Sequence, residues 1–104
     1  MIFAAMEKRG RTDMNLNNTV SMMNSDDYKE RFKAEYWQTK IRYEKLHKLI
    51  VRHEAGTLDF KLSCPIMILE AQKRHMGEYL HVLQIRAEIE GIDLEGLNME
   101  DRHD

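Results

Sequence analysis

The sequence predicts an all-α fold, an antiparallel two-helix hairpin with helices at about residues 26–55 and 65–90 that assembles into a homo-oligomeric helical bundle. Apolar residues recur at helical spacing through both segments, and glycines end them. Each segment also carries more apolar surface than one neighbouring helix can cover. With 104 residues the chain forms one small domain, divided into a flexible leader (1–24), a hairpin domain (25–94) and an acidic C-terminal tail (95–104).

The first helix is expected to begin at the acidic pair Asp26 and Asp27 and to end at Gly56. Asp27 is a good N-cap residue, and Glu30 three positions later completes a capping-box pattern. One apolar stripe faces the partner helix and consists of Tyr28, Phe32, Tyr36, Tyr43, Leu46 and Ile50. The preceding residues show no sustained period, so they predict a poorly ordered leader.

Residues 56–64 are expected to form an ordered loop that folds Phe60 onto the end of the hairpin. Pro65 suits the first position of the second helix, and Gly91 ends that helix. Its main apolar stripe is Ile66, Leu69, Met76, Leu80, Leu83 and Ala87. A second stripe, formed by Ile68, Val82, Ile85 and Ile89, lies about 100–200° around the helix and predicts a second packing partner.

Trp37, the only tryptophan, points about 100–180° away from the main stripe of its helix. Together with Ile41 and the second stripe of the other helix, it is predicted to be left uncovered by a single hairpin. Two-helix chains of this size rarely bury enough apolar surface to fold alone. Self-association into a homo-oligomer is therefore the predicted way of covering these residues.

Composition narrows the function classes. The net charge is -2, charged residues make up 33% of the chain, and no apolar run reaches membrane-spanning length. A near-zero net charge argues against duplex nucleic acid, although basic residues gather in 29–52 and acidic residues in 88–104. Cys64 has no second cysteine to pair with, and no signal-peptide pattern is present, so we expect a cytoplasmic protein.

The predicted ligand-binding residues are Trp37, Tyr36, Lys33 and Lys40 on the first helix and Arg86 on the second. A base or another planar ring could stack on Trp37 while lysines hold phosphates. The alternative is that Trp37 is an anchor at a subunit interface. Arg86 is expected to form a bridge to Glu35, and otherwise to offer its guanidinium to a phosphate or carboxylate.

No enzymatic motif is present, so the sequence predicts a protein without catalytic residues, cofactor or metal. The five histidines are not spaced as metal ligands, and Cys64 is interpreted as a loop or capping residue.

The hairpin segment resembles a family of small helical-hairpin proteins of phages and prophages named after a crAss-like phage member. The resemblance covers about Ser25 to Leu94 and lies in the stretches DYKERFKAEY, KLHKLI, MGEYLHVL and RAEIEGI. More loosely, the chain is similar to the helical hairpin of phage anti-CBASS and anti-Thoeris sponge proteins, homo-oligomers that sequester nucleotide second messengers between subunits. No binding residue is carried over from either group.

These resemblances imply a phage counter-defence protein in the cytoplasm of a bacterial host. It would sequester a cyclic nucleotide or ADP-ribose-type signal at intersubunit pockets without cleaving it. One alternative is a protein inhibitor of a host defence nuclease, with the acidic tail imitating nucleic-acid charge. A further alternative is a structural or regulatory phage component without a ligand.

Overall fold

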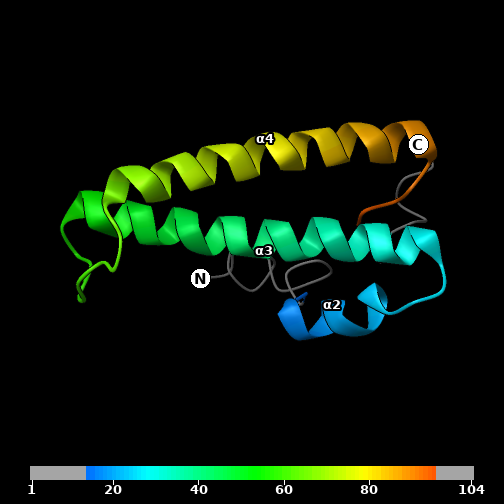
Figure 1. The fold of residues 1–104 in the computed structure, drawn as a ribbon, viewed down its shortest axis with the longest axis horizontal. Coiled ribbons are helices and arrows are strands. Elements are labelled where there is room, and N and C mark those ends of the chain that lie inside the picture. Colours follow the sequence, from blue (N-terminus) through cyan, green and yellow to red (C-terminus); the bar gives the residue numbers. More distant parts are fainter. Residues whose placement is uncertain (1–13, 96–104) are drawn as a thin grey trace, which may run out of the picture.

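The computed structural model describes residues 14–95. Three helices lie within this range: α2 (Leu16–Met23), α3 (Tyr28–Ala55) and α4 (Ile66–Glu90). α3 and α4 run side by side in opposite directions, and α2 packs on the other side of α3 (Figure 1). The described residues contain helices and no strands, which confirms the all-α class.

α2 occupies part of the segment that the sequence predicted as a poorly ordered leader. Asn15 caps its first turn: the Asn15 side chain accepts from the Asn18 amide, and the Asn18 side chain accepts in return from the Asn15 amide. Thr19 is buried on this helix, and its hydroxyl donates to the Leu16 carbonyl over 2.7 Å. The prediction failed because a two-turn helix shows too few repeats to establish a period. Residues 1–13 lie outside the described residues.

α3 ends at Ala55 as predicted and begins at Tyr28, two residues after the predicted start, with Asp27 as its N-cap. The Asp27 carboxylate accepts from the Lys29 amide over 3.0 Å, which satisfies one of the unpaired donors of the first turn. Gly56 ends the helix with φ 77°, a left-handed conformation that suits a residue without a Cβ.

α4 begins one residue later than predicted, with Pro65 at the cap position and no side-chain cap. Gly91 ends it with φ 71°, which reverses the chain and lays residues 92–95 back toward α3 (Figure 1). Phe60 in the connecting loop is 56% exposed, so the prediction that it folds onto the end of the helices is wrong.

The core lies at one end of the helix pair, around the first half of α3 and the last half of α4. Its buried members are Phe32, Tyr36, Trp37, Leu80, Leu83, Ala87 and Ile92. Toward the connecting loop the two helices are joined by fewer buried side chains, of which Ile50 is one. No helix among residues 14–95 is long and apolar enough to cross a membrane. The predicted acidic tail lies, apart from its first residue, outside the described residues.

Candidate functional site

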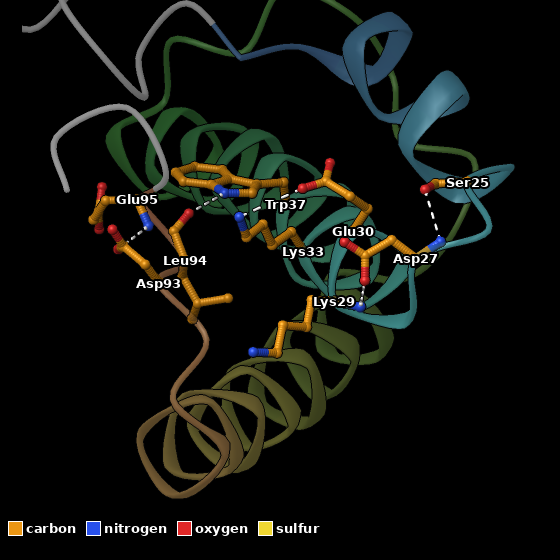
Figure 2. A network of polar contacts seen from close by, with 9 residues as sticks. All are labelled: Ser25, Asp27, Lys29, Glu30, Lys33, Trp37, Asp93, Leu94 and Glu95. Carbon is orange, nitrogen blue, oxygen red and sulfur yellow. Dashed lines mark hydrogen bonds and ion pairs between the residues drawn. The ribbon is translucent and has the colours of Figure 1, made fainter.

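Trp37 is part of the core of its own chain, so the prediction that the helix pair leaves it uncovered is wrong. Its side chain is 5% exposed and meets Tyr36 edge-on, with 5.3 Å between the ring centroids. Its indole N–H donates to the Leu94 carbonyl over 2.7 Å (Figure 2). The segment after α4, with Ile92 buried and Leu94 partly buried, covers the face that α4 itself does not reach.

The two predicted lysines have partners on their own helix. Lys33 lies 3.5 Å from the Glu30 carboxylate and Lys40 lies 3.8 Å from that of Glu44. Such neighbouring pairs contribute a few tenths of a kcal/mol and leave both charges partly hydrated. The Lys33 side chain lies next to the Trp37 indole (Figure 2). The indole itself is buried, so its face is not open to a ligand.

Arg86 joins the ends of α3 and α4 through partners that the sequence did not predict. Its Nε donates to the Glu90 carboxylate over 3.1 Å, and its terminal nitrogen donates to the Tyr28 hydroxyl. The Tyr28 hydroxyl in turn donates to Glu90 over 2.7 Å. The guanidinium also lies 4.7 Å from the centroid of the Phe32 ring. The expected bridge to Glu35 is absent from these contacts, and Glu35 acts on Arg86 only as a nearby charge.

These contacts shift the ionisation of the three groups. The hydrogen bond from Tyr28 is the main cause that lowers the pKa of Glu90, and Arg86 adds to it. The hydrogen bond to Glu90 raises the pKa of Arg86 and also that of Tyr28. The Arg86 guanidinium therefore connects the end of α4 to the start of α3, which is a structural role.

The structure thus brings together Tyr36, Trp37 and Lys33 but covers the two rings with residues of the same chain. The Tyr36 hydroxyl accepts a hydrogen bond from the Gln84 side chain over 3.3 Å. A small cavity of about 200 Å³ lies under residues 92–95, beside Tyr36, Gln84 and Glu88. It is too small for a nucleotide, since typical ligand sites measure about 300–1,000 Å³.

A larger open groove lies between α3 and α4 nearer the connecting loop, with a volume of about 790 Å³. We call it the α3–α4 groove. From α3 it is lined by Tyr43, Ile50 and Glu54. From α4 it is lined by Glu70, Lys73, Arg74, Gly77, Glu78, His81 and Val82.

Gly77 shapes the centre of this groove. A Cβ atom on Gly77 would lie 3.3 Å from Cε1 of Tyr43, which is tighter than ordinary van der Waals contact. The absence of a side chain therefore lets the tyrosine ring approach the backbone of α4. One turn away, the Lys73 ammonium lies 5.9 Å from the centroid of the same ring. An aromatic ring, two cationic side chains and carboxylates thus line one open space.

The α4 residues of the groove share a face with the cavity under residues 92–95. Positions 70, 74, 77, 81, 84 and 88 follow each other at three- and four-residue steps, so they form one line along the helix. The groove and the covered Trp37 region are therefore neighbours on the same side of the helix pair.

Sequence reasoning missed the residues of the α3–α4 groove. Arg74 and His81 do not stand out in the sequence, because polar and charged residues on a helix usually face water. The available signal was Gly77, since a glycine inside a helix costs about 1 kcal/mol relative to alanine and needs a packing reason. No cluster of three or more histidine, cysteine or acidic side chains able to hold a metal occurs within residues 14–95.

Comparison with protein families settles the class. The sequence pattern of the family described as Sequestin matches residues 26–89, which is more than half of the chain. The chain belongs to the Sequestin family. The match spans nearly the same residues as the predicted resemblance and confirms it, and the family's name is consistent with sequestration of a molecule. No curated protein and no solved structure matches the chain.

Proposed function

We propose that this Sequestin-family protein sequesters a small nucleotide signal by non-catalytic binding, as a phage counter-defence protein. The observation that carries the proposal is the α3–α4 groove, in which the Tyr43 ring and the cations Lys73 and Arg74 line one open space. Family membership supports sequestration as the mode of action. The binding site proposed here replaces the one expected around Trp37, which the fold covers.

Each part of a nucleotide has a matching group in the groove. Tyr43 offers a half-buried aromatic ring against which a base can stack, a contact worth about 1–3 kcal/mol. Lys73 and Arg74 offer charge-assisted hydrogen bonds to phosphate oxygens. Glu54 and Glu70 can accept hydrogen bonds from ribose hydroxyls.

The volume supports a ligand larger than a mononucleotide. About 790 Å³ lies in the upper part of the range for drug-sized ligands, and the groove is open to solvent on one side. A cyclic dinucleotide or an ADP-ribose-type molecule fits this size class. Val82 lines the rim of the groove and is exposed, so a second copy of the chain has room to complete the site as a homo-oligomer.

Sequestration needs only binding. The protein lowers the free concentration of a signal when its binding sites outnumber the signal molecules and the dissociation constant lies below the signalling concentration. A dissociation constant of 1 µM corresponds to about −8 kcal/mol, which a few charge-assisted bonds and one stacked base can supply. No bond in the ligand has to break, and the ligand is recovered intact when the protein is denatured.

Isothermal titration calorimetry of the full chain against cyclic oligonucleotides and cyclic ADP-ribose isomers tests the proposal. We expect at least one of them to bind and to be recovered unchanged by mass spectrometry. Lys73→Ala should weaken that binding about ten- to a hundred-fold, since a hydrogen bond to a charged group is worth about 1.5–3 kcal/mol. Lys48→Ala, an exposed lysine outside the groove, is the matched control. Failure of every ligand to bind, or equal effects of the two variants, would refute the proposal.

A further inference from the structure

The outer face of α4 carries a heptad pattern that its own chain does not cover. Ile68, Val82 and Ile89 are exposed at seven-residue multiples, and Ile85 is exposed between them. In heptad notation, the a positions are Ile68, His75, Val82 and Ile89, and the d positions are Ala71, Glu78 and Ile85. We call this line of seven residues the outer seam. Ile89 is 78% exposed, which is unusual for an isoleucine in a folded chain.

The outer seam lies roughly opposite the core of the molecule. Leu80, Leu83 and Ala87, which are buried against α3, follow a different line around the same helix. α2 packs on α3 and does not contact α4 (Figure 1). Within residues 14–95, the outer seam is therefore an apolar stripe about 30 Å long that faces solvent.

The two polar residues of the seam indicate what covers it. His75 and Glu78 lie at its middle, and the His75 ring nitrogen Nδ1 is 3.4 Å from the Glu78 carboxylate. A single polar layer inside an apolar seam is how paired helices fix their register. A membrane surface or an unrelated apolar groove would bury the His75–Glu78 pair without offering it any further polar partner, which costs free energy.

One pairing of two copies matches the seam residues from Ile68 to Ile85 layer by layer and leaves Ile89 at the end of the contact. In a parallel pair, equivalent positions meet, so two Glu78 carboxylates would face each other. In an antiparallel pair, a positions meet d positions. One register then places Ile68 against Ile85 of the second copy, Ala71 against Val82, and His75 against Glu78. A shift by one heptad would instead place Glu78 against Val82 or Ile68, burying a carboxylate in an apolar layer.

We propose that a second copy of this chain packs antiparallel against the outer seam of α4, with His75 and Glu78 of both copies forming its central polar layer. The pairing is two-fold symmetric and closed, so it predicts a dimer and not a filament. Each copy contributes the same apolar line, and the dimer contains α3, α4 and their two-fold mates as one layer of four helices.

This dimer joins the two binding grooves. Arg74 and His81 line the α3–α4 groove and also flank the outer seam on one side, seven residues apart. In the antiparallel register, Arg74 lies beside His81 of the second copy. Both grooves open on the same face, and their adjoining rims carry an arginine, Arg74, from each of the two chains. This part rests on the proposed function, whereas the dimer itself does not depend on a ligand.

The oligomeric state of the full chain tests the interface. We expect sedimentation equilibrium to give twice the 12.4 kDa chain mass. Ile85→Asp should raise the dimer dissociation constant at least about tenfold, because it places a charge in the apolar seam. Val51→Asp is the matched control, since Val51 on α3 and Ile85 are both 46% exposed. Both variants should keep their helical circular dichroism signal.

Cysteine cross-linking tests the register independently of Ile85→Asp. In a Cys64→Ser background, oxidation of Ile68→Cys chains mixed with Ile85→Cys chains should give a cross-linked dimer. Each variant alone should remain largely uncross-linked, because the antiparallel register separates like positions.

A monomeric wild-type chain, equal effects of the two aspartate variants, or efficient cross-linking of Ile68→Cys alone would overturn the proposed dimer. A wild-type chain that dimerises but binds none of the tested nucleotides would instead refute the proposed function and leave the interface standing.

Discussion

Replacing Trp37 with alanine should destabilise the fold itself. A residue that served only ligand binding or assembly would leave the fold intact. The side chain is 5% exposed, lies in the core cluster and donates a hydrogen bond to the Leu94 carbonyl. Removing a buried tryptophan costs about 3–5 kcal/mol in transfer and cavity terms. The released carbonyl adds little, because the cavity lets water reach it.

Trp37→Phe separates the two contributions. The phenyl ring keeps most of the buried apolar area and removes the indole N–H, which leaves the Leu94 carbonyl without this donor. We expect a loss of about 1–2 kcal/mol for this variant. The free energy of unfolding should therefore fall from wild type to Trp37→Phe through loss of one hydrogen bond. It should fall further in Trp37→Ala because a cavity forms.

Urea unfolding followed by far-ultraviolet circular dichroism measures these differences, at one fixed chain concentration because assembly contributes to stability. Phe60→Ala removes an exposed aromatic side chain and is the control, with an expected change within about 0.5 kcal/mol. If Trp37→Ala unfolded at the wild-type urea concentration, the core role assigned to Trp37 would be wrong.

Substitutions at three further positions test other contacts. Gly77→Ala should leave stability within about 1 kcal/mol of wild type in urea unfolding, because better helix propensity offsets crowding of Tyr43, and calorimetry should show weaker ligand binding as the groove narrows. In Tyr28→Phe, NMR titration should show the pKa of Glu90 moving up toward its ordinary value, because Tyr28 is the main cause of its lowering. The depressed pKa of Glu90 contributes stability at neutral pH that is lost as pH falls through the acidic range, so this variant should show a smaller acid-induced loss. Asp27→Ala should cost about 1 kcal/mol in thermal unfolding, whereas Asp27→Asn, which keeps a capping oxygen, should cost less.

The helices and their ends could be predicted because they depend on local chemistry. Asp27, Gly56 and Gly91 each act on backbone groups within a few residues, and the apolar period is long enough in α3 and α4 to be read without tertiary information. α2 was not predicted, because eight residues are too few to show a helical repeat of apolar positions. Its stability comes from packing on α3, which the sequence does not display.

The site could not be predicted from helical spacing alone. Helical spacing shows that Trp37 points away from the residues that face α4. It cannot show that the chain reverses at Gly91 and that the following residues cover the Trp37 side chain. Arg86 was expected beside Glu35, but it pairs with Glu90 one turn along its own helix and donates to Tyr28 of α3. The α3–α4 groove forms where few side chains fill the space between the two helices. Its position follows from the packing of many residues and not from any one of them.

The hydrogen bond between Trp37 and Leu94 gives the protein a built-in reporter. The chain has one tryptophan, so its fluorescence and its indole proton signal arise from a single position. That position senses whether residues 92–95 lie on the helix pair. A ligand entering the neighbouring groove or a second chain docking on α4 could then be followed without a label, by whether the indole stays shielded from water.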